Sequence, residues 1–109
     1  MKSLTSYAVH WVDFEPVRGA EMAKARPAVI VSRDELNRHL KTVTVCPLTT
    51  SIHPGWRTRL RIELDGKVAE IAGDQIRTVS VERIGTKLGS LLPDEVAKLK
   101  SLLTELYGQ

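Results

Sequence analysis

Short apolar runs separated by polar turns predict a sheet of several short strands. The segment 9–14 (VHWVDF) combines valine with aromatic residues and favours a first strand. The continuous apolar run 28–32 (AVIVS) is typical of a strand covered on both faces, and 43–48 (VTVCPL) predicts another central strand. Because Pro47 lacks a backbone N–H, we expect the far end of this strand to leave the ladder of hydrogen bonds.

The clearest alternation lies within 57–64, where arginines at every second position alternate with uncharged side chains. Asp65 and Gly66 follow, a pair that favours a tight hairpin turn, so the segment 68–72 should return as the partner strand. A further short strand is predicted at 76–79. Five to seven short strands in a chain of this length favour a small, strongly bent β-barrel.

The C-terminal segment has helical periodicity instead. Pro93 suits the first position of a helix, and Gly108 follows its last turn. The apolar positions between them fall on one face, Val96, Leu99, Leu102, Leu103 and Leu106. This face should pack on the sheet or across a contact between two subunits. The polar segment 33–40 can form a helical turn or two, with Ser32 as its N-cap. The predicted class is therefore mainly β (α+β).

Composition narrows the class of protein. The 109 residues suit a single domain, 1–109, and hydrophobic residues at 42% supply one modest core. Cys46 is the single cysteine, which excludes an internal disulfide and a thiolate metal cluster. No apolar run approaches the length of a membrane span, and the first twenty residues lack the pattern of a signal peptide. We expect a soluble cytoplasmic protein.

Positive charge is concentrated in the middle of the chain. Residues 18–61 hold nine Lys or Arg against three Asp or Glu, although the net charge of the whole chain is only +3. Such a basic block suits a polyanion, nucleic acid first. A basic surface that is merely solvated explains the block equally well.

Three motifs occur in order along the chain. Within 16–28, Pro-Val-Arg-Gly-Ala-Glu is followed after four residues by Arg-Pro-Ala. The second motif is 45–50 (VCPLTT), and the third is 74–77 (DQIR). Together with the C-terminal helix, their order and spacing resemble the MazF/PemK toxins of bacterial toxin–antitoxin systems over residues 7–107.

The resemblance implies an SH3-like β-barrel of the PemK type, usually a homodimer, with single-stranded RNA lying across the dimer groove. It implies a metal-independent, sequence-specific endoribonuclease that needs no cofactor and leaves a 2′,3′-cyclic phosphate and a 5′-hydroxyl. A cognate MazE/PemI-like antitoxin would inhibit by placing its C-terminal segment in the same groove. No membrane partner is expected.

The residues themselves exclude several other chemistries. The histidines His10, His39 and His53 have no paired spacing and no neighbouring pair of carboxylates, as a metal site would need. A nucleophile elbow, a Walker loop and a dinucleotide turn are also absent from the sequence. RNA remains a suitable substrate because its 2′-hydroxyl is its own nucleophile. The protein must then align the attack and stabilise the charged phosphorane.

Arg26 is the main catalytic candidate, because a guanidinium can hold two phosphate oxygens at once. By resemblance, the matching arginine also transfers a proton, and donation to the leaving group suits its high pKa better than acting as a base. The alternative is a structural ion pair with Glu21 or Asp74. Thr49 can orient a phosphate oxygen or cap its own loop, and Thr50 could take its place.

Two residues are candidates for the general base. Glu21 can act as the base or orient the arginine, and it can equally be a solvated loop carboxylate. His53 is the other candidate, since histidine is the usual general base of metal-free ribonucleases, although a lone loop histidine is more often incidental.

Two segments marked by proline and glycine are predicted to be loops, 15–24 and 49–56, and most of the predicted RNA contacts lie in or next to them. Trp56 can stack an unpaired base while Arg57 holds a phosphate, but Trp56 can equally belong to the core. Gln75 can read a base edge. The remaining predicted RNA contacts are Arg18, Lys24 and Thr50. By contrast, Arg59 and Arg61 are expected on the solvent face of the hairpin.

Two other functions fit the same fold. One is a non-catalytic toxin like CcdB, which uses this barrel to bind DNA gyrase, and the other is an SH3-like RNA-binding module without catalysis. Arg26 and Thr49 at the active-site positions favour the enzyme, because neither alternative needs them.

Overall fold

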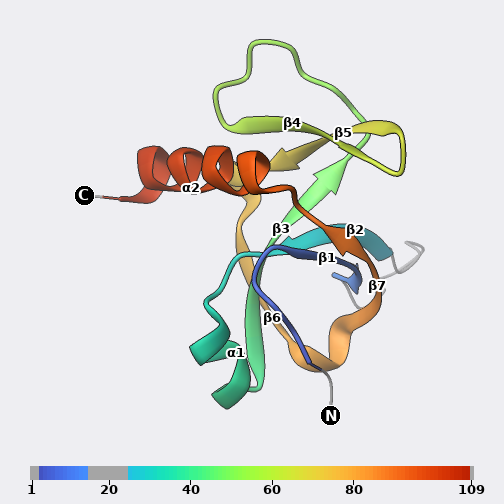
Figure 1. Cartoon of the computed structure of the whole chain (residues 1–109), viewed down its shortest axis with the longest axis vertical. Coiled ribbons are helices and arrows are strands. Elements are labelled where there is room, and N and C mark those ends of the chain that lie inside the picture. The colour runs from blue at the N-terminus through green and yellow to red at the C-terminus, as the bar shows by residue number, and fades with distance from the viewer. Residues whose placement is uncertain (1–2, 15–24, 109) are drawn as a thin grey trace, which may run out of the picture.

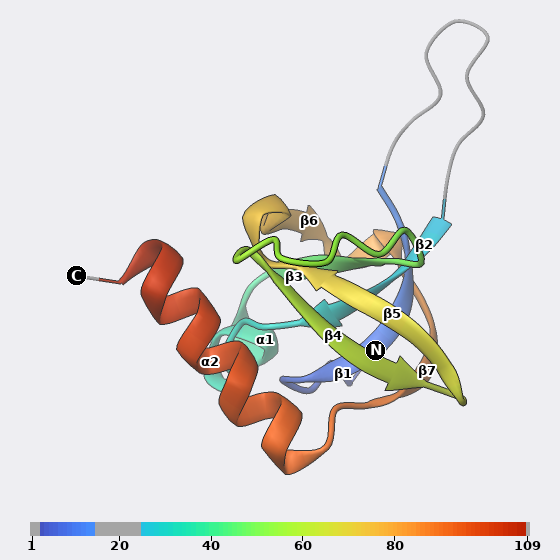
Figure 2. The ribbon, with the colours of Figure 1, turned by 90° about the horizontal axis from the view of Figure 1, so that it is seen from above.

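The computed structural model describes residues 3–14 and 25–108, in which short strands form one curled antiparallel sheet. The neighbours follow the order β4-β5-β3-β2-β1-β7, and β6 lies beside β3. The seven strands of the described residues are β1 (Ala8–Asp13), β2 (Ala25–Ile30), β3 (Thr42–Thr49), β4 (Arg59–Leu64), β5 (Lys67–Ala72), β6 (Arg77–Ser80) and β7 (Ile84–Ser90). The curl of the sheet is visible in two perpendicular views (Figure 1, Figure 2). This arrangement confirms the predicted mainly β fold.

The pairing of strands shifts two of the predicted bounds. β2 begins at Ala25, before the predicted run 28–32, because its pairing with β1 extends to Asp13 opposite Ala25. β7 was not predicted from the sequence. Its residues are mostly exposed or half-buried, so they carry a weak apolar pattern, and hydrogen bonding to β1 defines the strand.

β3 pairs with three other strands along its length. Its first half pairs with β6, and its middle pairs with β2, with Pro47 opposite Ala28. Beyond Pro47 the strand leaves its ladder with β2, but it does not leave the sheet, because Leu48 and Thr49 pair with β5. The predicted end of pairing at the proline was therefore wrong. A proline is tolerated here because the strand changes partners at this point.

The predicted hairpin connects β4 and β5. Both turn residues have positive φ, 52° at Asp65 and 76° at Gly66. Positive φ at both central positions defines a type I′ turn, whose twist matches that of the two strands. The turn sets the register along the whole hairpin, from Leu64 opposite Lys67 to Arg59 opposite Ala72.

The C-terminal helix α2 (Pro93–Tyr107) ends at the predicted glycine, with Gly108 as its C-cap. At its start, the Glu95 carboxylate accepts a hydrogen bond from the N–H of Leu92 at 2.8 Å. Leu99 is fully buried in a cluster that includes Ile62 and Ile71 of the β4–β5 hairpin. The apolar face therefore packs on the sheet, as Figures 1 and 2 show.

The short helix α1 (Asp34–His39) has Arg33 rather than the predicted Ser32 at its N-cap. The Ser32 hydroxyl is used elsewhere, because it accepts the N–H of Thr44 and donates to Oδ1 of Asn37. A second core cluster includes Ile30, Val45 and Ile84. Within the described ranges, no helix is long and apolar enough to cross a membrane.

Candidate active site

A groove of about 360 Å³ opens where the end of β3 meets β2 and the β4–β5 hairpin. Arg26 and Thr49, the two main catalytic candidates, both line it, and Thr50 lies beside them. The topology explains this meeting, because β2 and β3 are antiparallel with Ala28 opposite Pro47. Arg26 precedes Ala28 by two residues and Thr49 follows Pro47 by two, so both lie at the same end of this antiparallel pair. The remaining lining residues are Pro27, Leu48, Ser51, Leu64, Lys67, Val68 and Ala69.

The Arg26 side chain is available to an anion in this groove. The residue is exposed, and in the part of the chain that the structure describes it has no ion-pair partner. Asp74, one of its two predicted structural partners, instead accepts a hydrogen bond from Arg59. The other predicted partner, Glu21, lies outside the described residues. Lys67 adds a second cation to the groove wall.

Thr49 occupies the end of β3 with its hydroxyl directed to its own loop. Its Oγ1 accepts the backbone N–H of Ser51 at 3.1 Å, which is the loop-capping role considered from the sequence. A hydroxyl has two acceptor lone pairs and one donor hydrogen, so the donor remains for a phosphate oxygen. Thr50 is exposed in the same groove, and both threonines can reach a bound anion there.

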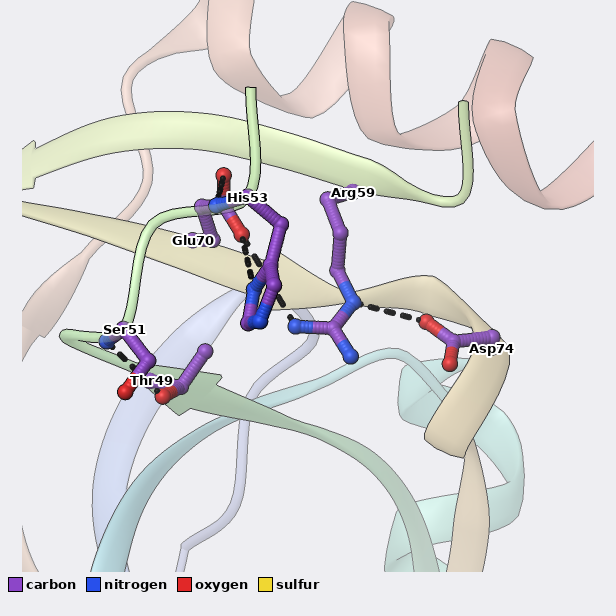
Figure 3. Close-up of polar contacts among 6 residues, drawn as sticks. All are labelled: Thr49, Ser51, His53, Arg59, Glu70 and Asp74. Atoms are coloured by element: carbon purple, nitrogen blue, oxygen red, sulfur yellow. Dashed lines mark hydrogen bonds and ion pairs between the residues drawn. The ribbon is translucent and has the colours of Figure 1, made fainter. Parts of the chain in front are cut away.

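A buried charge cluster lies next to the groove (Figure 3). Its centre is Glu70, which is only 3% exposed and lies directly opposite Thr49 in the β3–β5 pairing. Glu70 Oε2 accepts the backbone N–H of His53 at 2.9 Å, and Oε1 lies 3.6 Å from His53 Nδ1 and 3.7 Å from Arg59 Nη1. Arg59 also donates from Nε to Asp74 Oδ1 at 2.9 Å.

The predicted position of Arg59 on the solvent face was wrong, because its side chain is only 6% exposed. Two carboxylates, those of Glu70 and Asp74, form ion pairs with this guanidinium and so stabilise its buried position. Burial alone raises the pKa of the Asp74 carboxyl, but the hydrogen bond from Arg59 and other contacts outweigh it, so the net pKa lies below the ordinary value. Arg59 and Asp74 therefore form a structural pair.

Trp56 lies on the loop between β3 and β4 and does not belong to the core. It is 50% exposed, and its ring stacks on that of His53 at 4.0 Å between centroids. The Arg59 guanidinium carbon lies 4.8 Å from the indole centroid. Of the two interpretations offered by the sequence, core packing is thus excluded and an exposed aromatic surface remains.

The other sequence-predicted residues lie outside this groove or outside the described ranges. Arg57 is 87% exposed and pairs at 3.7 Å with Glu105 of α2. Gln75 is exposed in the short helix η1 (Gly73–Gln75) and does not line the groove. Arg18, Glu21 and Lys24 lie outside the described residues.

Sequence reasoning missed Glu70 as part of the site. A signal was present, since it is the one charged residue inside the otherwise apolar return segment 68–72. The burial of such a carboxylate requires paired partners, and those come from separate elements. Cys46 has no role in this chemistry, because burial, aided by the Asp74 carboxylate, raises the pKa of its thiol to about 12. Among residues 3–14 and 25–108, no three His, Cys, Asp or Glu side chains gather as a metal site.

Comparisons with known proteins identify the family of this chain. The sequence model of the PemK-like, MazF-like toxins of type II toxin–antitoxin systems matches residues 5–107. The endoribonuclease toxin MazF of Escherichia coli strain K12 is 29% identical over 99 residues, which cover 90% of this chain and 88% of that protein.

Solved structures share the fold. An endoribonuclease in complex with its cognate antitoxin, from a mycobacterial species, has a TM-score of 0.79 at 25% identity, covering 99% of this chain and 96% of that one. MazF in a MazE–MazF complex from Deinococcus radiodurans has a TM-score of 0.82 at 22% identity, covering 100% and 99%. With the family model matching nearly the whole length, the chain belongs to the PemK-like, MazF-like toxins of type II toxin–antitoxin systems.

Proposed function

We propose that this protein is the endoribonuclease toxin of a toxin–antitoxin pair and cuts single-stranded RNA at specific sequences. The substrate's 2′-hydroxyl attacks the adjacent phosphorus, and the products carry a 2′,3′-cyclic phosphate and a 5′-hydroxyl. The observation that carries this proposal is the shared groove, which is lined by the exposed Arg26, by Thr49 at the end of β3 and by Thr50 directly after it. A planar fork of donors next to a hydroxyl donor suits a phosphate that gains negative charge as it reacts.

In the proposed mechanism, Arg26 holds two oxygens of the scissile phosphate and stabilises the phosphorane. Thr49, or Thr50 in its place, donates to a further oxygen and orients it. A base removes the proton of the 2′-hydroxyl, for which Glu21 and His53 are the candidates. The bond to the 5′-oxygen then breaks, and this oxygen takes up a proton from Arg26. No metal and no cofactor takes part.

The substrate extends beyond the scissile phosphate. We propose that the RNA backbone is contacted by Arg18, Lys24, Thr50 and Arg57. Gln75 is proposed to read a base edge. Lys67, on the wall of the groove, provides a further cation for a phosphate. Trp56 is proposed to contact a base, which its exposure supports.

The proposed working form is a homodimer in the cytoplasm, where its RNA substrates are found. The mycobacterial relative is an endoribonuclease in complex with its cognate antitoxin, and we propose an antitoxin of the MazE/PemI kind for this chain. Its binding segment would occupy the groove and compete with RNA. A membrane partner is not proposed.

The test is incubation of the pure protein with total RNA in excess EDTA, followed by gel analysis and mass spectrometry of the product ends. We expect discrete fragments with 2′,3′-cyclic phosphate and 5′-hydroxyl ends. Activity that disappears in EDTA and returns with Mg²⁺ would contradict the metal-free mechanism. RNA binding without cleavage would identify a binding module instead, and DNA gyrase binding without either would identify a CcdB-like toxin.

A further inference from the structure

The indole of Trp56 is an exposed aromatic surface supported from beneath by two side chains. His53 stacks against it with an interplanar angle of 27°, and Arg59 lies close to its ring. Both supports also contact Oε1 of Glu70, at 3.6 and 3.7 Å. Both therefore lie close to the indole and to one buried oxygen, while Trp56 remains 50% exposed.

The buried carboxylate adds to the backbone hydrogen bonds that hold the loop at Trp56, where the N–H of Trp56 donates to the carbonyl of His53 at 3.1 Å. Glu70 holds the loop near its start, through the backbone N–H of His53, and at its end, through the side chain of Arg59. An exposed ion pair gives little order to a loop, but here both charged side chains are at most 6% exposed. Glu70 is therefore able to keep Trp56 in one place.

The same carboxylate links the indole to the groove. Thr49 lies directly opposite Glu70, and side chains paired in this way have Cβ atoms about 5 Å apart on one face of the sheet. Figure 3 shows Thr49, Glu70, His53 and Arg59 grouped together at this point. A phosphate bound at Thr49 and a base stacked on Trp56 would thus be held at a fixed distance from each other.

We propose that Trp56 is a stacking platform for one unpaired base of the RNA, and that Glu70 is a positioning residue that sets this platform relative to the threonine end of β3. The proposal rests on the proposed function, because it assumes a single-stranded RNA substrate. Stacking tolerates every base, since each has a π face. The platform therefore contributes affinity and register, while base identity is read elsewhere.

The binding test uses a 2′-O-methyl octanucleotide that contains the mapped cleavage site and cannot be cut, because it lacks the nucleophile. In a Trp11→Phe background, Trp56 is the single tryptophan and reports on stacking by its fluorescence. We expect the emission to be quenched on saturation. In the wild-type background, Trp56→Ala should raise Kd about 5- to 150-fold, whereas Trp56→Phe should retain most of the affinity.

Leu40→Ala is the matched control, because Leu40 is also 50% exposed and follows α1 at the other end of the molecule (Figure 1). This variant should bind the octanucleotide as the wild type does. Unchanged Trp56 emission at saturation, or wild-type affinity of Trp56→Ala, would overturn the platform.

The positioning role of Glu70 is tested with Glu70→Gln, which keeps an acceptor for the His53 N–H and removes the charge. It should shift the emission of Trp56 and raise Kd several-fold, but add little to the Kd of a Trp56→Ala protein. His53→Ala, which leaves the buried ion pair intact, should weaken binding in the same non-additive way. This second variant keeps the test decisive if Glu70→Gln lowers the melting temperature. Fully additive effects would overturn the positioning role.

Failure of the platform and failure of the proposed function give different results. Cleavage of total RNA that is unaffected by Trp56→Ala overturns the platform and leaves the ribonuclease in place. Quenching of the Trp56 emission by single-stranded RNA of mixed sequence, without any cleavage of that RNA by the wild type, overturns the ribonuclease and leaves the stacking site in place.

Discussion

Arg26 and Arg59 are the same residue type in neighbouring regions of the molecule, but their surroundings give them different roles. Arg26 is exposed in the groove without an ion-pair partner among the described residues. Arg59 is 6% exposed and contacts two carboxylates. A guanidinium with both partners already in place has little left for a substrate. We therefore propose catalysis for Arg26, which has no ion-pair partner among the described residues, and a structural role for Arg59, which has two partners.

The largest expected effect is the loss of stability when Arg59 is removed. Arg59→Ala leaves the Glu70 carboxylate buried without its main counter-charge, so the free energy of unfolding should fall by about 3–5 kcal/mol. Urea denaturation followed by fluorescence measures the loss. Arg61→Ala on the same strand is the control, because Arg61 is exposed, and its stability should change by less than about 0.5 kcal/mol. Equal effects of the two variants would contradict the structural role.

The second variant concerns catalysis. Arg26→Lys keeps the charge but loses the two-point contact, so single-turnover cleavage should slow by roughly 10²- to 10³-fold. RNA affinity and melting temperature should remain close to wild type, because one charge is preserved and no core volume is removed. Arg33→Lys is the matched control, since the Arg33 side chain is 78% exposed and pairs only with Glu35 among the described residues. A wild-type rate for Arg26→Lys would move the search to Glu21 and His53.

Thr49→Ala should have a smaller effect on the same reaction, about 10-fold, because it removes a neutral donor rather than a charged one. Thr50→Ala, measured beside it by single-turnover cleavage, tells which hydroxyl contacts the phosphate. The residue whose loss slows cleavage without lowering the melting temperature is the phosphate contact. If neither change slows the reaction, the role of the β3 end in catalysis is excluded.

Acid should weaken the structural pair through Asp74. Because its folded-state pKa lies below the ordinary value of 3.8, the ionised carboxylate stabilises the fold above that value, and this contribution is lost as pH falls through the folded pKa. Asp74→Asn should therefore show a smaller loss of stability between about pH 5 and pH 2 than the wild type. Denaturation midpoints across that range measure it, and parallel curves for the two proteins would contradict the assignment.

The smallest expected effect concerns Cys46. With the pKa of its thiol raised to about 12 by burial, the fraction of thiolate at neutral pH is negligible. A thiol reagent added to the native protein should react only after denaturant is added. Rapid labelling of the native protein at pH 7 would contradict the burial of this side chain.

Local patterns predicted much of the fold. The turn at Asp65 and Gly66 was predictable because only a few residue types accept positive φ at both central positions of a hairpin turn. The apolar face of α2 was predictable because helical periodicity is carried by residues three and four apart. β7 was not, because its pairing with β1 is a contact between distant parts of the chain, and its own residues show no strong pattern.

Sequence patterns were sufficient to predict the core strands, the amphipathic helix and the motifs that contain Arg26 and Thr49. Which charged residues face the solvent, by contrast, depends on contacts between elements of the fold. In the alternation of β4, Arg59 and Arg61 look equivalent, yet Arg59 is buried because Glu70 and Asp74 come to it from β5 and η1. Burial of a charge depends on partners that pair with it in space, and residues eleven and fifteen positions away leave no local signal.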